Sequence, residues 1–233
     1  MLRLVQTLVQ TPVPRPVPQP VAELAFESAD FVDYGAEPDD GGAIEADEWA
    51  GSVKATDGGD HLAPMFKKNW KRSNDAGLKR GAYHFFYWCR TAGEQADWFI
   101  RNVPREANLL PPVLDVEWNG ASRTCTYRPS KVTAVAELQR FMDRIEAHYG
   151  KRPIIYTAVD FHRDVLVGQF KDYHFWLRAV ADHPSKVYED RRWAFWQYTS
   201  TGVIPGVDGE VDINVFAGSQ KNWKNWVAAV SAN

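Results

Sequence analysis

The chain has 233 residues, of which 45% are hydrophobic and 24% are charged, a composition that excludes a wholly disordered protein. It contains no run of about 18 apolar residues, so we expect no transmembrane helix. The net charge is −3, but residues 21–60 hold twelve of the 30 acidic residues and only one of the 27 basic ones. The rest of the chain is therefore mildly basic, without the concentrated basic stripe of a nucleic-acid-binding protein.

A proline-rich segment precedes the main part of the chain. Proline occupies every second position from Pro12 to Pro20. Because proline fixes φ and has no N–H to donate, this segment is predicted to be an extended polyproline II stretch. We expect a flexible tether over residues 1–25 and one folded domain over residues 26–233. The first nine residues are apolar only in patches and no small-residue cleavage site follows, so no clear signal peptide is predicted.

Short apolar strands alternate with amphipathic helices through most of the domain. Strands are predicted at residues 51–56, 81–86, 113–117 and 153–157. Helices are predicted between them at residues 64–76, 91–103 and 130–149. Further strands follow at residues 173–177, 193–198 and 211–214, and a terminal docking helix is expected around residues 222–227. This order predicts an α/β fold, an irregular TIM-like barrel whose final third consists mostly of strands.

Acidic residues close two of the predicted strands. Asp115 and Glu117 are two residues apart on one strand, so their side chains point to the same face. Asp212 lies in the last strand, and a less certain acid, Asp30 or Asp33, lies near the first. Two carboxyls held close cannot both ionise freely, and a protonated acid beside an ionised one can cleave glycosidic bonds. Taken alone, however, the pair favours a solvated strand end with both acids ionised.

Six sequence segments, taken together, favour a catalytic role for these acids over an idle one. They are Val53–Gly59, Ala76–Phe86, Leu110–Glu117, Pro153–Thr157, Phe195–Tyr198 and Gly209–Phe216. In sequence and order they resemble the glycoside hydrolase family 25 muramidases, lysozymes that are common in phages and bacteria. The resemblance covers roughly residues 52–218, and six matches in order are far more specific than one.

The resemblance implies a β/α barrel of the family's irregular form, with about five β/α units and extra C-terminal strands. It implies hydrolysis of the β-1,4 bond between N-acetylmuramic acid and N-acetylglucosamine in peptidoglycan. By position, Glu117 resembles the general acid and base, and Asp115 resembles the residue that orients the 2-acetamido group or stabilises charge beside it. Asp212 corresponds to the acid of the last strand, either a nucleophile or a support for attack by the acetamido group.

Several further residues are assigned to substrate binding. Tyr83 and Tyr156 match strand-end tyrosines of the family, and Trp196 and Gln197 match its late Trp-Gln-Tyr strand. Asp57 stands where the family more often has glutamate. Trp118 lies just past a strand end, where its ring could stack on a sugar or simply cover the barrel mouth.

The chain departs from the family pattern at its first strand. Counting back from Lys54 favours Asp30 as the first-strand acid, whereas the apolar-then-acid order of Val32 and Asp33 favours Asp33. The stretch from residue 39 to 48 holds two glycines and several acids, which makes a poor helix. A remodelled first unit leaves one alternative function, a catalytically impaired module that binds cell-wall glycan.

No metal or other cofactor is predicted, because the histidines lack ligand spacing and no phosphate-binding loop is present. Cys89 and Cys125 follow neighbouring strands, and either a disulfide or two thiols is compatible with the sequence. His84 is expected on the face opposite Tyr83, as a hydrogen-bonded residue between barrel and helix. We expect a monomer that acts on peptidoglycan glycan strands at the cell wall, by an unknown export route, without inserting into a membrane.

Overall fold

The structure is a computed structural model that describes residues 2–3, 31–34, 50–188, 191–203 and 210–231. Its strands are β1 (Leu2–Arg3), β2 (Phe31–Tyr34), β3 (Ala50–Asp57), β4 (His61–Leu62), β5 (Lys79–Phe85), β6 (Val113–Val116), β7 (Ile154–Thr157), β8 (Phe175–Arg178), β9 (Phe195–Gly202) and β10 (Val211–Phe216). Its helices are α2 (Phe66–Asp75), α3 (Ala92–Asn102), α4 (Lys131–Tyr149), α5 (Val159–Phe161), α6 (Pro184–Val187) and α7 (Gln220–Ser231), and a π-helical turn (His162–Leu166) follows α5.

The strands form one strongly curled mixed sheet. Strands β3, β5, β6, β7, β8 and β9 are joined in that order by parallel pairings. Strand β10 runs antiparallel to β9 and parallel to β2, and β2 runs antiparallel to β3. The two ends of the sheet are therefore linked through β10 and β2. The α/β class predicted from the sequence is confirmed.

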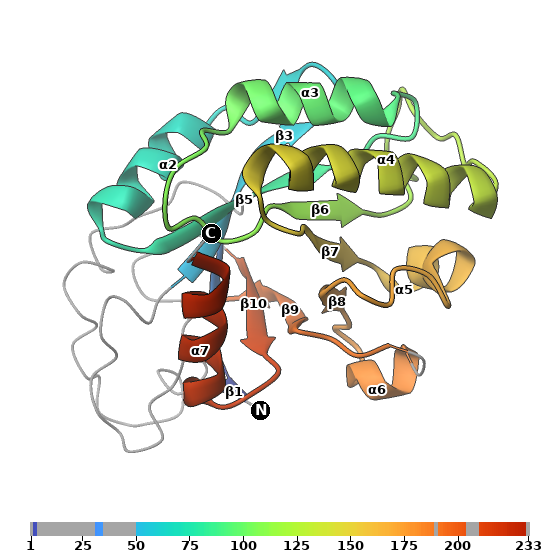
Figure 1. Ribbon diagram of the computed structural model, residues 1–233. Coiled ribbons are helices and arrows are strands. Elements are labelled where there is room, and N and C mark those ends of the chain that lie inside the picture. The colour runs from blue at the N-terminus through green and yellow to red at the C-terminus, as the bar shows by residue number, and fades with distance from the viewer. Residues whose placement is uncertain (1, 4–30, 35–49, 189–190, 204–209, 232–233) are drawn as a thin grey trace.

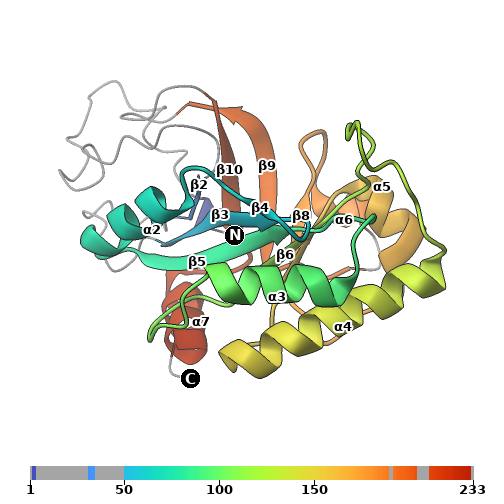
Figure 2. The same ribbon diagram turned by 90° about the horizontal axis from the view of Figure 1, so that it is seen from above.

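Three helices cover the outer face of this sheet. Helices α3 and α4 lie side by side over β3, β5 and β6, and α2 covers β3 and β5 (Figures 1 and 2). The predicted apolar stripe of α4 is buried against this layer, including Leu138, Met142 and Ile145. The ends of this helix are also as predicted: Ser130 Oγ accepts from Thr133 N, and Gly150 ends the helix with φ +71°.

Helix α7 covers the end of the sheet at which the parallel strands begin, opposite their C-terminal ends. Trp223 and Val227 of α7 are buried in an apolar cluster with Val113, Ile154, Trp176, Phe195 and Phe216. Val113, Ile154 and Phe195 are the first residues of β6, β7 and β9. The predicted terminal docking helix is thus confirmed. In parallel β/α folds the loops at the other, C-terminal ends of the strands are where function is usually found.

The N-terminal prediction is only partly within the described residues. Leu2 and Arg3 pair antiparallel with Phe216 and Val215 of β10, whereas the proline-rich segment and the boundary near residue 25 lie outside the described residues. None of the helices in the described ranges is both long and apolar enough to cross a bilayer.

Candidate active site

The curled sheet gathers several predicted site residues at one end. The strand register aligns Asp115 of β6 with Phe85 of β5 and Tyr156 of β7. Asp115 and Asp212 line one small cavity of about 50 Å³, together with Tyr83, Val113, Tyr156, Trp176 and Gln197. Glu117 follows the end of β6, two residues beyond Asp115, and its charge raises the pKa of Asp115. Asp115 and Asp212, which are 97 residues apart in the chain, therefore lie close together.

A chain of hydrogen bonds fixes Asp212. Tyr156 Oη donates to Gln197 Oε1 at 2.7 Å, and Gln197 Nε2 donates to Asp212 Oδ1 at 2.7 Å. Because the amide uses its acceptor for tyrosine and its donor for aspartate, the network defines its orientation. Neither of these two bonds involves Asp212 Oδ2.

Asp115 is the most strongly perturbed acid of the site. Burial raises the pKa of its carboxyl well above the usual range, and the charges of Glu117 and Asp212 raise it further, while Lys54 opposes the rise. Its Oδ1 atom is buried and accepts no hydrogen bond from the described residues. An acceptor that is buried without a partner is costly, so this atom is ready to receive a donor from a ligand.

Glu117 and Asp212 are perturbed in the same direction. Burial raises the pKa of Glu117; the guanidinium of Arg178 opposes this rise, and the charges of Asp160 and Asp212 add to it. Burial also raises the pKa of Asp212, again against Arg178. The pKa of each of the three carboxyls is therefore raised, which favours holding a proton within the cluster beside a negative charge.

The neighbouring tyrosine stays protonated under these conditions. Burial raises the pKa of Tyr156 well above its usual range, and the charges of Asp115, Glu117 and Asp212 add to the effect. Tyr156 is therefore a hydrogen-bond donor, in agreement with its bond to Gln197.

Two of the predicted substrate-binding tryptophans lie away from the cavity. Trp196 precedes Gln197 on β9 and so faces the opposite side of the sheet, where its Nε1 donates to Ala179 O at 2.8 Å. Trp118 donates from Nε1 to Asp164 Oδ2 at 2.9 Å and packs against Trp88. Neither tryptophan lines the cavity that holds Asp115 and Asp212.

The other predicted acids are Asp57 and the two alternatives Asp33 and Asp30. Asp57 ends β3, and its Oδ2 lies 3.7 Å from Lys54 Nζ. Asp33 lies in β2, opposite Gly51 of β3 and Ile213 of β10, and its side chain is outside the described part of the structure. Asp30 is also outside the described residues. Of the two alternatives, only Asp33 is therefore placed beside the last strand.

Sequence reasoning missed the cations of the site. Arg178 follows a predicted strand directly, and Lys54 lies within another, but a search for paired carboxylates selects neither. Their charges act on all three acids. A basic residue at the end of a strand next to acidic strand ends was the available signal.

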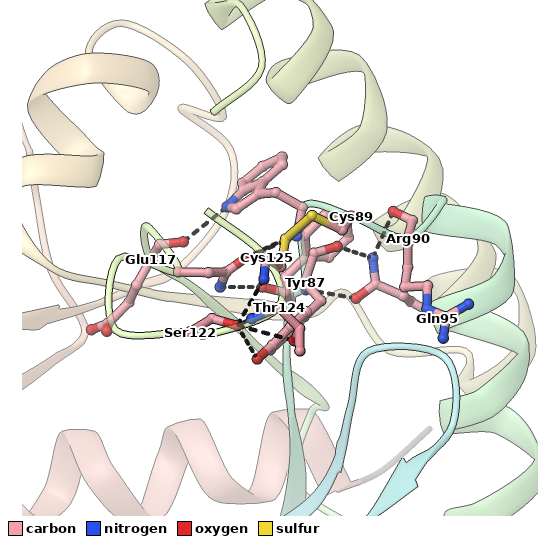
Figure 3. The surroundings of a disulfide bond; sticks show 11 residues. Tyr87, Cys89, Arg90, Gln95, Glu117, Ser122, Thr124 and Cys125 are labelled. Atoms are coloured by element: carbon pink, nitrogen blue, oxygen red, sulfur yellow. Dashed lines mark hydrogen bonds between the residues drawn. A yellow bond between two sulfur atoms is a disulfide. The ribbon is translucent and has the colours of Figure 1, made fainter. Parts of the chain in front are cut away.

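The loops after β5 and β6 are tied together at the rim of the site (Figure 3). Cys89 and Cys125 form a disulfide, with a Cα–Cα distance of 5.7 Å, which settles the alternative that the sequence left open. Trp88 Nε1 donates to the backbone oxygen of Glu117 at 2.9 Å. Asn119 makes two further hydrogen bonds to the segment after β5: Trp88 N donates to Asn119 Oδ1, and Asn119 Nδ2 donates to Phe86 O. The backbone that carries Glu117 is thus held by the neighbouring loop.

Other expectations concern buried histidine and metals. Within the described ranges, no three His, Cys, Asp or Glu side chains gather in a group that could hold a metal ion. His84 is buried on the outer side of β5, with Nδ1 2.8 Å from Thr56 Oγ1 and Nε2 3.1 Å from Gln95 Oε1. The structural role predicted for this histidine is confirmed.

Comparison with known proteins agrees with this arrangement. The sequence matches the model of glycosyl hydrolases family 25 over residues 48–207, a range that includes Asp115 and Glu117 and ends before Asp212. The uncharacterized protein YegX of Escherichia coli K12 is 32% identical over 179 residues, which cover 76% of this chain and 62% of YegX. Lysozyme M1 of Streptomyces globisporus is 33% identical over 175 residues, which cover 72% of this chain and 59% of that protein.

The chain therefore spans about three fifths of the length of these curated relatives. Among solved structures, a family 25 glycosyl hydrolase from Bacillus anthracis is 34% identical with a TM-score of 0.67, covering 75% of this chain and 80% of that one. A lysozyme from Streptomyces coelicolor is 30% identical with a TM-score of 0.65, covering 77% and 85%. The matched range exceeds half of the chain, and the chain belongs to glycosyl hydrolase family 25.

Proposed function

We propose that this protein is a muramidase that cleaves the β-1,4 bond between N-acetylmuramic acid and N-acetylglucosamine in peptidoglycan. The observation that carries the proposal is the meeting of Asp115, Glu117 and Asp212 at one end of the sheet of a family 25 chain. Relatives named as a lysozyme and as N,O-diacetylmuramidases support the choice of substrate.

The fold that we propose for the domain is the irregular β/α barrel of the family, with five β/α units. It is supported by the helix that follows each of β3, β5, β6, β7 and β8, and by the pairing of β10 with both β9 and β2. The domain would occupy residues 26–233, after a tether over residues 1–25.

Glu117 is the general acid in this mechanism. Burial raises its pKa and so favours its protonated form, and Glu117 gives that proton to the glycosidic oxygen as the bond to the leaving sugar breaks. The resulting carboxylate then accepts a proton from the water that completes hydrolysis. The bond from Trp88 to the Glu117 backbone holds the residue in place during both steps.

The other two acids orient the sugar and stabilise the positive charge that develops on it. Asp115 Oδ1, a buried acceptor with no partner in the described structure, suits the N–H of the 2-acetamido group. Asp212, fixed by Gln197 and Tyr156, presents negative charge to the oxocarbenium-like state or to the intermediate that follows. Tyr83 lines the same cavity and would hydrogen-bond to sugar, and Asp57 would contact sugar farther along the rim.

The proposed place of action is the cell wall, and the proposed active form is a monomer. Hydrolysis is tested with the Glu117→Gln variant on purified peptidoglycan. We expect the variant to keep the parental melting temperature and to lose about 10²–10⁴-fold in kcat, because the amide cannot donate the proton. The measurement is the appearance of new reducing ends, with identification of the sugar at those ends.

Reducing-end muramic acid supports the proposed bond, whereas reducing-end glucosamine or freed peptides contradict it. Wall binding by the parent without new reducing ends would instead support a glycan-binding module. A Glu117→Gln variant that clears walls at the parental rate would exclude Glu117 as the acid.

A further inference from the structure

A second, larger depression lies beside the acid cluster. Its volume is about 440 Å³, and it is open to solvent. One wall is the turn between β3 and β4, with Asp57, Asp60 and His61. The other wall consists of the loops after β5 and β6, with Tyr87, Arg90 and the disulfide. We refer to it as the rim groove.

The rim groove is close to the reacting centre. The strand register aligns Asp57 with Phe85 and Phe85 with Asp115 across β3, β5 and β6. Neighbouring strands are about 4.8 Å apart, so the backbones of Asp57 and Asp115 are separated by roughly 10 Å. Figure 3 shows Glu117 on one side of the disulfide and Arg90 on the other. A branch on a sugar bound at the acids can therefore reach this groove.

Both walls of the rim groove are held in place by contacts within the protein. Gly58 N donates to Phe85 O at 3.3 Å, and Trp98 Nε1 donates to His61 O at 2.8 Å, which fix the β3–β4 turn. The hydroxyls of Tyr87 and Ser122 are 2.9 Å apart, and the disulfide joins the same two loops. A site that is formed before binding loses little conformational entropy when a ligand arrives.

The groove carries charges that folding does not require. Arg90 Nη2 lies 2.6 Å from Asp60 Oδ2, and the two side chains are 47% and 72% exposed. An ion pair as exposed as this contributes little to stability. In peptidoglycan that carries stem peptides, the lactyl carboxyl of muramic acid is used in the amide bond to the peptide, so the glycan itself gives no reason for the exposed charges of Arg90 and Asp60. A ligand that has carboxylates and an amine would account for these charges.

We propose that the rim groove binds the stem peptide of peptidoglycan. Arg90 would pair with a peptide carboxylate, and Asp60 with a peptide amine. The peptide is attached to muramic acid, one of the two sugars at the cleaved bond, so it has to leave the cleft close to the acids. This inference rests on the proposed function, because that function places muramic acid beside Asp115.

The test measures binding to walls with and without stem peptides. The probes are intact sacculi and sacculi from which an amidase has removed the peptides, and the protein carries Glu117→Gln so that it does not digest them. Adding Arg90→Gln should weaken binding to intact sacculi roughly three- to tenfold and leave binding to stripped sacculi unchanged. Arg144→Gln is the matched control, because Arg144 also pairs with an aspartate, Asp97, on the outer helices.

Each other outcome overturns the proposal. Equal weakening on both kinds of sacculi would mean that the groove holds sugar, and no weakening on either would mean that it holds neither. The proposed function is tested separately: it is wrong if the parent chain makes no new reducing ends from either kind of sacculi. The two failures are distinguishable because binding is measured with a variant that does not hydrolyse the wall. Melting temperatures of both variants exclude a folding defect as the cause.

Discussion

Two cations determine how the acids of the site share their protons. Arg178 opposes the rise in pKa that burial causes at Glu117 and Asp212, and Lys54 does the same for Asp115. Without positive charge, burial and mutual repulsion would favour protonation of every carboxyl. Catalysis of the proposed kind needs one protonated acid and at least one ionised acid at the same pH. The cations therefore set the pH range in which the site works.

We predict that Arg178→Met moves both limbs of the pH–rate profile to higher pH. Loss of the guanidinium raises the pKa of Glu117, so the general acid keeps its proton to higher pH and the alkaline limb moves up. It also raises the pKa of Asp212, which then ionises only at higher pH, so the acidic limb moves in the same direction. The measurement is kcat/KM for reducing-end release across pH.

The conservative variant separates charge from packing. Arg178→Lys keeps the positive charge and should hold both limbs closer to their parental positions than Arg178→Met does. A profile of Arg178→Met that falls in height without moving along the pH axis would show that Arg178 acts on substrate position and not on the acids.

The sequence predicted individual site residues unevenly. The spacing of Asp115 and Glu117 at a strand end made them candidates, but the family resemblance was needed to assign them and Asp212 to catalysis. Trp196 was assigned to substrate by the same pattern, but the alternation of side chains along β9 places Gln197 inside and Trp196 outside. Arg178 was not assigned: its position at a strand end was a signal, but its role depends on which strands become neighbours after folding.

Elements with strong local signals were predicted well. Helix α4 has apolar residues at steps of three and four, a serine cap and a terminal glycine, and the structure shows all three features. The turn from α5 into the π-helix was not predicted, because its hydrogen bonds depend on distant residues: Arg191 Nη2 donates to Leu166 O, and Arg191 Nε lies 3.1 Å from His162 Nε2. Contacts of this kind leave no periodic pattern in the sequence.

Buried His84 joins three elements of the outer layer. It lies on β5 between Thr56 of β3 and Gln95 of α3, and its ring stacks on Phe141 of α4. Burial lowers its pKa from 6.5 to about 4, although the bond to Gln95 opposes the shift. The folded protein therefore holds the neutral ring at pH values where the unfolded chain binds a proton.

This difference predicts a pH-dependent contribution to stability. Because the folded pKa is lowered, the contribution is fully present above pH 6.5 and is lost as the pH falls toward about 4. The loss amounts to about 3 kcal/mol. In His84→Gln, the free energy of unfolding should lack this part of the pH dependence, so the gap between parent and variant narrows over that range. Urea titrations at several pH values measure it.

Thr56→Val is the control for this prediction. It removes one hydrogen-bond partner of the ring and keeps the histidine, so the variant should be less stable but retain the slope. If His84→Gln and the parent follow parallel curves between pH 4 and 6.5, the proton linkage does not lie at His84.

At the scale of the whole molecule, the sheet is completed by distant parts of the chain. Strand β10 pairs with β9, and also with β2 about 180 residues earlier in the sequence. Helix α7 then covers the apolar end of the sheet with Trp223 and Val227. The strand order was predictable from the alternation of strands and helices. These late pairings were not, since nothing local in residues 211–216 specifies their partners.

The disulfide is the only covalent link between distant segments in the described part of the chain. Cys89 and Cys125 are separated by 36 residues, a span that includes all of α3 and all of β6. Disulfides persist in oxidising compartments, which agrees with the proposed action at the cell wall. Closing a loop of this length reduces the entropy of the unfolded chain and is expected to stabilise the fold by about 3–4 kcal/mol.

We therefore predict that the double variant Cys89→Ser/Cys125→Ser melts roughly 10 °C below the parent, as measured by circular dichroism. Reductant should lower the melting temperature of the parent by a similar amount and leave that of the double variant unchanged, because the variant has no bond to break. This pair of measurements separates loss of the cross-link from the change of side chain at Cys125, which is buried. A parent whose melting temperature ignores reductant, while the double variant is destabilised, would assign the stabilisation to the packing of Cys125.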